Sequence, residues 1–241
     1  MFNLGAAYYN GDGVQIDDDL SYAWFALAKE AGSSQAVEAV ARAESQLPAW
    51  RITDGYKRIA RLCEDGVYAP GNQAQAASWW LKAAIRGDKE AQVAIANKLL
   101  NGEGVPQDFA RARYWCSEIA KDGEATGQFC LGHIYQKGLG VPTNAKTARR
   151  WYQDAANQGH IAAIRALAQM DETGEGANVD LTEAFVLYAE LALAKDKGAA
   201  QAAVRVKNQM TAKQWKQAQK LLPTHRVDPQ KLDALLQSAT P

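Results

Sequence analysis

Cysteine, proline and long apolar runs are all scarce in this chain of 241 residues. Its three cysteines, Cys63, Cys116 and Cys130, are too few and too irregularly spaced for a disulfide framework or a zinc knuckle. No apolar stretch approaches the roughly 18 to 20 residues that a membrane helix needs, and the residues after Met1 lack the blocks of a signal peptide. The sequence as written therefore predicts a soluble protein without a transmembrane segment.

Charge of one sign is also lacking, because 27 lysines and arginines balance 27 aspartates and glutamates. A balanced chain has no overall field that would recruit nucleic acid, an anionic membrane or an acidic substrate. We therefore expect a neutral partner, or one that recognises a local patch, and no nucleic acid.

Catalytic motifs are absent as well. The chain has no Gly-x-Ser-x-Gly elbow, phosphate loop or His-Glu-x-x-His, and its histidines, His133, His160 and His225, fall at unlike positions that cannot form a repeated metal motif. We expect no enzymatic activity, no cofactor and no metal. A hydrolase using Cys130 and His133 is the alternative, although no orienting carboxylate is identifiable. Cys116 and Cys130 are expected on adjacent helices as free buried thiols, with a bridge as the alternative in an oxidising compartment.

What the sequence does have is helical periodicity and a repeat. Alanine is abundant and apolar residues recur at three- and four-residue spacing, which predicts helices almost throughout. The glycines that open each turn are Gly11, Gly66, Gly102, Gly138 and Gly174, and the last four are spaced by 36 residues. A fixed period of this length is typical of stacked helical repeats, so we predict five helical hairpins.

Each hairpin has its own start and stop signals. A glycine ends the first helix because it can adopt the left-handed conformation. An Asp or Asn six residues later is suited to cap the second helix, at Asp17, Asn72, Asp108, Asn144 and Asp180. The second repeat departs from the pattern, with Tyr68 in place of the second glycine.

The ends of the chain match each other. Shifting the sequence by 163 residues aligns Leu4 with Leu167, Gly11 with Gly174 and Arg42 with Arg205 without a gap. In each copy the hairpin is followed by an extra alanine-rich helix, at about 35–47 and 199–209, and then by a further helix. For 199–222 we predict a cap, and for 33–51 a relic cap or a bend. The expected organisation is 1–56 (first unit plus extra helix), 57–159 (three regular units), 160–222 (terminal unit plus capping helices) and 223–241 (tail with a short helix).

The tail carries an apolar stripe of Leu232, Leu235 and Leu236 after an Asp228-Pro229 helix start. We expect this stripe to pack on its own solenoid, with self-association through the C-terminal helix as the alternative.

The pattern Leu-Gly-x-x-Tyr-x-x-Gly-x-Gly-Val, then Asp or Asn, then Trp-Tyr, Ala-Ala and Gly, resembles the Sel-one-like repeat (SLR) family of tetratricopeptide-like proteins. Residues 124–159 match it most fully, and the resemblance covers about 1–222. It implies an all-α, right-handed α-solenoid of helix-turn-helix repeats. It also implies that the first helices line a concave face and that the protein works as an adaptor or scaffold.

Two columns of residues on that expected concave face are candidates for ligand binding. They recur every 36 residues, and they are Lys57, Val93, Phe129 and Arg165 in one column and Arg61, Asn97, His133 and Gln169 in the other. The first column is positive at its ends and apolar in its middle, and the second is made of hydrogen-bonding residues. We predict that they line a groove for a peptide, with Lys57, Arg61 and Arg165 holding carboxylates.

The function predicted from the sequence is therefore a non-enzymatic scaffold that binds protein or peptide. The alternative is a carbohydrate-associated cell-envelope protein of a bacterial secretion or polysaccharide system, in which exposed Trp50 and Trp80 stack on sugars. The series Trp79, Trp115 and Trp151 is expected to be buried packing rather than a stacking ladder. The compartment stays open. The short start of the first repeat suggests a piece of a longer array, and an upstream signal peptide would indicate a periplasmic or exported protein.

Overall fold

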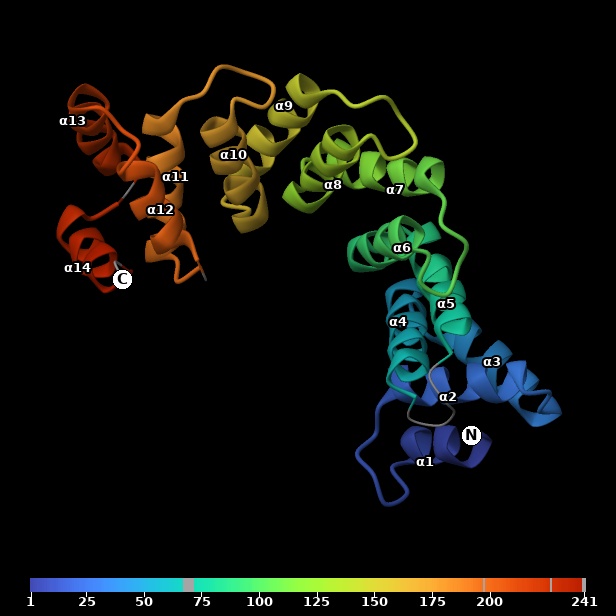
Figure 1. Ribbon diagram of the computed structural model, residues 1–241. Coiled ribbons are helices and arrows are strands. Elements are labelled where there is room, and N and C mark those ends of the chain that lie inside the picture. Colours follow the sequence, from blue (N-terminus) through green and yellow to red (C-terminus); the bar gives the residue numbers. More distant parts are fainter. Residues whose placement is uncertain (67–71, 197, 226, 240–241) are drawn as a thin grey trace. The chain divides into compact units, whose positions relative to one another are not determined.

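The computed structural model describes residues 1–66, 72–196, 198–225 and 227–239. The chain forms two compact units, residues 1–115 and 116–241, and each is described by itself. All regular secondary structure in the described ranges is helical, as the periodicity predicts (Figure 1). The turn of the second repeat, which contains Tyr68, lies outside the described residues.

The N-terminal unit is a series of helices joined by short turns. They are α1 (Phe2–Asn10), α2 (Asp18–Glu30), α3 (Ser34–Gln46), α4 (Ala49–Asp65), α5 (Gln73–Ile85), α6 (Lys89–Asn101) and the first part of α7 (Phe109–Lys121). Helix α2 packs against α1, α3 and α4, and α5 packs against α4 and α6. The unit is therefore a row of hairpins in which α3 is an additional helix beside α2.

The C-terminal unit continues from Cys116 in α7. Its further helices are α8 (Ala125–Lys137), α9 (Ala145–Ala156), α10 (Ile161–Thr173), α11 (Leu181–Leu193), α12 (Ala199–Lys207), α13 (Ala212–Leu221), the 3₁₀ turn η1 (Leu222–His225) and α14 (Pro229–Ala239). Helix α11 contacts α10, α12 and α13, so α12 lies beside α11 as α3 lies beside α2. The internal duplication seen in the sequence is thus confirmed in three dimensions.

The predicted start and stop signals are confirmed. The first glycine of every turn has positive φ and ends the preceding helix, at Gly11, Gly66, Gly102, Gly138 and Gly174. Every predicted capping residue accepts a hydrogen bond from the backbone N–H three residues further on, and these residues are Asp17, Asn72, Asp108, Asn144 and Asp180. These caps satisfy donors that the first turn of a helix leaves without an intrahelical partner.

In two of the turns the second glycine has a different role, which is close packing against the preceding repeat. A Cβ added to Gly104 would lie 2.0 Å from the carbonyl oxygen of Gln73, at the start of α5. A Cβ on Gly176 would lie 2.8 Å from the carbonyl oxygen of Ala145, at the start of α9. The turn of one repeat therefore lies directly on the second helix of the repeat before it, where no side chain fits.

The tryptophans pack mostly as expected. Trp79 and Trp115 are buried, and Trp151 is half-buried. The Trp79 ring lies 5.3 Å from that of Tyr56, and the Lys82 ammonium lies 3.3 Å from its centroid. The series therefore serves packing within the hairpins.

The C-terminal tail packs on its own unit. Leu232 and Leu236 of α14 are buried, and α14 contacts α11 and α12, as Figure 1 also shows. The expectation that this apolar stripe docks in cis is confirmed, and it removes most of the surface that self-association through α14 would use.

The expectation of free thiols at Cys116 and Cys130 is wrong, because these residues form the alternative disulfide, between α7 and α8. Their Cα atoms are 5.8 Å apart, within the range that a bridge requires. Cys63 is buried and not bridged. In the bridged protein, Cys130 has no thiol with which to act as the nucleophile of a hydrolase.

Candidate functional site

The predicted columns begin on α4 with two cations that already have acidic neighbours. The Lys57 ammonium lies 2.8 Å from Asp54 and 2.9 Å from Asp88, and 14% of the side chain is exposed. Burial opposes the charge, but the hydrogen bonds to these two carboxylates outweigh it and raise the pKa of Lys57. Arg61 is exposed and pairs with Glu90. A ligand carboxylate would have to compete with these pairs.

The next members of the columns are the uncharged residues Val93 and Asn97 on α6. Val93 is half-buried and Asn97 is exposed. The Asn97 amide therefore offers both a donor and an acceptor to a partner of the N-terminal unit.

In the C-terminal unit, Phe129 and His133 lie one turn apart on α8. The Phe129 ring stacks on His160 at 4.7 Å and lies 5.6 Å from Tyr152, so it packs within the repeats. His133 is half-buried, and burial together with the nearby Lys137 lowers its pKa. Its imidazole is therefore neutral at pH 7, with one donor and one acceptor nitrogen.

The last members of the columns lie on α10. Arg165 pairs with Asp196, and Gln169 is exposed. As with Lys57, the cation that sequence reasoning assigned to a ligand has a carboxylate of its own chain as its partner.

These contacts share one spacing, which the sequence analysis missed. Three members of the first column contact the residue 31 positions further on, in the segment that follows the second helix of the same hairpin: Lys57 with Asp88, Phe129 with His160 and Arg165 with Asp196. The column therefore ties the first helix of each of these hairpins to the segment that follows its second helix. A comparison of the column with the residues that precede the following helix would have indicated these pairs.

The aromatic residues assigned to the carbohydrate alternative differ in exposure. Trp50 is 59% exposed, as expected, but Trp80 is only 4% exposed and its indole N–H donates to Glu64 at 3.0 Å. The expectation of an exposed Trp80 is wrong. A buried ring cannot stack on a sugar, so Trp50 is the only one of these two tryptophans that could bind a carbohydrate in this way.

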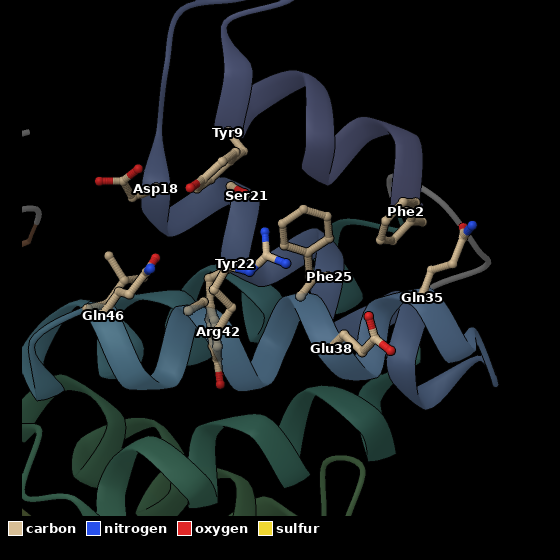
Figure 2. A pocket seen from close by; sticks show the side chains of 13 residues that line it. Phe2, Tyr9, Asp18, Ser21, Tyr22, Phe25, Gln35, Glu38, Arg42 and Gln46 are labelled. Carbon is tan, nitrogen blue, oxygen red and sulfur yellow. The ribbon is translucent and has the colours of Figure 1, made fainter.

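The N-terminal unit has a groove between α1, α2 and α3, with a volume of about 300 Å³ (Figure 2). Its lining comprises Phe2, Tyr9, Asp18, Ser21, Tyr22, Phe25, Gln35, Glu38, Ala39, Arg42, Ala43, Gln46 and Leu47. Figure 2 shows the Phe2 and Phe25 rings between α1 and α3, and their centroids are 5.3 Å apart. We call this feature the α1–α3 groove.

Two polar groups of the α1–α3 groove have hydrogen-bond or ion-pair partners on neighbouring helices. The Tyr22 hydroxyl donates to Glu44 at 3.0 Å, and burial, followed by interactions with Tyr56 and Glu44, raises the pKa of Tyr22. Asp18 pairs with Arg51. The guanidinium of Arg42, the one cation among the lining residues, has no ion-pair or hydrogen-bond partner among the described residues. Figure 2 shows this guanidinium turned from α3 toward Phe25.

Two positions of α1 correspond in sequence to the predicted columns, and one of them, Phe2, lines the groove. The 163-residue shift aligns Phe2 with Arg165, and Ala6 with Gln169. Sequence reasoning missed the groove because it continued the columns at a spacing of 36, which the longer first interval interrupts. The 163-residue shift was the signal that would have extended both columns to α1.

The equivalent position in the C-terminal unit is filled by an ionic network. The Arg205 guanidinium donates from Nε and Nη2 to the two oxygens of Glu172, each at 2.8 Å. The Tyr188 hydroxyl donates to the same carboxylate at 3.0 Å. Burial and the neighbouring Glu172 raise the pKa of Tyr188 to about 12, so it remains a donor at neutral pH.

This network predicts a pH-dependent contribution to stability. The hydrogen bond from Arg205 lowers the pKa of Glu172 below its usual 4.5, with burial opposing and Tyr188 assisting. A depressed carboxylate pKa stabilises the fold above about pH 4.5, and this stabilisation is lost as the pH falls through the folded-state pKa. Arg205→Gln should therefore lower the urea midpoint more at pH 7 than at pH 3, because the stabilisation fades as the pH falls through the folded-state pKa of Glu172. Arg42→Gln is the matched control and should give no such pH dependence; equal losses at both pH values for Arg205→Gln would contradict this assignment.

Other kinds of site find little support in the described ranges. No group of three or more His, Cys, Asp or Glu side chains there is arranged to hold a metal ion. Likewise, no helix in these ranges combines the length and the apolar character that crossing a membrane would require.

Comparison with solved structures places the chain among proteins of the same fold. It is similar to a protective antigen of uropathogenic Escherichia coli that displays an SLR fold, with 25% identity and a TM-score of 0.65 over 100% of this chain. The chain spans only 56% of the length of that antigen. A Sel1 repeat protein from Oxalobacter formigenes is 20% identical with a TM-score of 0.64, covering 100% of this chain and 84% of its own. A search of curated proteins found no match.

The family itself is shown by the sequence. The Sel1 repeat model matches residues 1–33, 53–88, 89–124, 125–160 and 161–196, and the unmatched 34–52 contains α3. The all-α hairpins, their glycine turns and these five matches agree, and the chain belongs to the Sel1 repeat family.

Proposed function

We propose that this protein is a non-enzymatic scaffold that binds a protein or peptide segment on the exposed face of its first helices. Sel1 repeats typically form protein-interaction scaffolds, which supports the general role. The observation that carries the proposal is the α1–α3 groove, an open space whose lining includes the aromatic side chains of Phe2, Tyr9, Tyr22 and Phe25. Burying an apolar side chain there would supply the main driving force for binding.

Within each unit, the predicted columns would extend this surface. Asn97, His133 and Gln169 have side chains that are not fully buried and that can hydrogen bond to a peptide backbone. Lys57, Arg61 and Arg165 would contribute less than the sequence suggested, because a ligand would have to displace Asp88, Glu90 or Asp196. Peptide binding would therefore depend on the α1–α3 groove more than on the columns.

The proposal can be tested by filling the groove. Ala39 lines it from α3, whereas Ala41 is exposed on the same helix and does not line it. Peptides selected from a random display library on the wild-type protein should bind the Ala39→Leu variant at least about tenfold more weakly, since each 1.4 kcal/mol of lost contact is tenfold in affinity. They should bind the Ala41→Leu variant normally, and both variants should fold because leucine is a good helix former. Unchanged affinity for Ala39→Leu would refute the assignment.

A further inference from the structure

The two ends of the array hold the same arginine in different surroundings. Arg205 on α12 has a bidentate carboxylate partner in Glu172 and a neighbouring hydroxyl in Tyr188. Arg42 takes the same place on α3, but the 163-residue shift puts Tyr9 where Glu172 stands and Phe25 where Tyr188 stands. The N-terminal copy therefore keeps the guanidinium and lacks both the carboxylate of Glu172 and the hydroxyl of Tyr188.

The space that the missing carboxylate would occupy is open. Tyr9 is 50% exposed, and Arg42 and Tyr9 both line the α1–α3 groove. No ring contact of Arg42 compensates for the lost carboxylate among the described residues. An arginine guanidinium presents donors in a fixed fork that matches a carboxylate, so the vacant position has a defined chemistry.

We propose that the α1–α3 groove recognises a single glutamate side chain flanked by apolar residues in a partner peptide. The inference rests on the proposed function and names the ligand chemistry of the same site. The partner glutamate would bind Arg42 as Glu172 binds Arg205 within the chain. Its apolar neighbours would pack on Phe2 and Phe25, whose rings line the groove.

The charges around the groove favour one acidic residue over an acidic run. Asp18 and Glu38 also line the groove, and Glu44 holds the Tyr22 hydroxyl behind it. These carboxylates would repel any second negative charge of the ligand, whereas the single cation Arg42 satisfies one. A chain terminus would also supply one carboxylate, and the experiment separates that source from a side chain.

The test uses three short peptides and nuclear magnetic resonance titration of the full chain, following the Arg42 Nε–H signal. The first peptide is acetylated and amidated and has one glutamate between leucines. The second replaces the glutamate with glutamine, and the third has no glutamate but a free C-terminal carboxylate. We expect the glutamate peptide to bind at least about tenfold more tightly than the other two, since charge-assisted hydrogen bonds are the strong ones.

Two variants of the protein complete the test. Arg42→Met should abolish the preference for glutamate, and Tyr9→Glu should do the same by restoring the internal ion pair of the C-terminal copy. Arg111→Met, which removes an exposed arginine outside the groove, should keep the preference. Equal binding of the glutamate and glutamine peptides, both weakened by Ala39→Leu, would overturn the glutamate assignment and leave the proposed function standing. Tighter binding of the free carboxylate peptide, or binding of none of the three, would also overturn it.

Discussion

Gly104→Ala is expected to lower the free energy of unfolding of the N-terminal unit by about 2–5 kcal/mol, combining left-handed backbone strain with overpacking. Gly104 has a φ of 73°, and a Cβ there would meet the backbone of Gln73 and Ala74 within 2.8 Å. Backbone atoms cannot move aside as the end of a side chain can, so the turn must shift away from α5. Urea denaturation followed by circular dichroism measures the loss.

Gly87 supplies the matched control for this prediction. It also has a positive φ, of 90°, but a Cβ there would meet nothing within 4 Å. Gly87→Ala should therefore cost only the backbone strain, about 1–2 kcal/mol. If the two variants lost the same stability, close packing of the turn on the preceding repeat would not be what the second glycine of the repeat provides.

Removal of the Cys116–Cys130 bridge is expected to cost about 3 kcal/mol, because the bridge closes a loop of about 15 residues in the unfolded chain. The Cys116→Ser/Cys130→Ser variant should show this loss in its denaturation midpoint. Reducing agent should lower the midpoint of the wild-type protein to a similar extent and leave that of the variant unchanged.

Counting thiols provides an independent readout of the bridge. Alkylation of the unfolded, unreduced protein should modify one cysteine, Cys63, and alkylation after reduction should modify three. Three modified cysteines without reduction would show that the bridge does not form in solution.

The architecture could be predicted from the sequence because its signals are local. The glycine that reverses the chain, the aspartate that caps the next helix and the apolar spacing each act within a few residues. The 163-residue match between the ends similarly predicted the extra helices, later seen as α3 and α12.

The candidate site could be predicted only in part, because side-chain partners depend on which helices meet. Lys57 and Arg165 belong to the predicted face, but Asp88 and Asp196, which pair with them, come from the segments that follow α5 and α11. The position of a charged residue in a column does not show whether a residue of opposite charge in the same chain already pairs with it. The exposure of Trp80 was misjudged for the same reason, since Glu64 binds its indole on a neighbouring helix.

The disulfide and the groove required three-dimensional information of different kinds. Cys116 and Cys130 were correctly expected on adjacent helices, but only the geometry brings their Cα atoms to 5.8 Å. The α1–α3 groove depends on the position of α3 beside α2, where small residues such as Ala39 and Ala43 leave space against Phe2 and Phe25. The sequence pattern indicates that the helix α3 exists, but it does not show the groove that α3 forms with α1 and α2.

The duplicated ends therefore differ in a way that bears on function. In the C-terminal copy, Arg205, Glu172 and Tyr188 satisfy one another. In the N-terminal copy, the arginine remains and its partners are replaced by aromatic rings that line an open groove. The same arrangement thus serves stability at one end and, in our proposal, recognition at the other.

The most direct test of this account is a map of amide chemical-shift changes when the single-glutamate peptide is added to the full chain. The account predicts that the largest changes fall on α1, α2 and α3, centred on Arg42 and Phe25, and that they disappear in the Ala39→Leu variant. Changes centred on any other helices, or changes that persist in that variant, would contradict it.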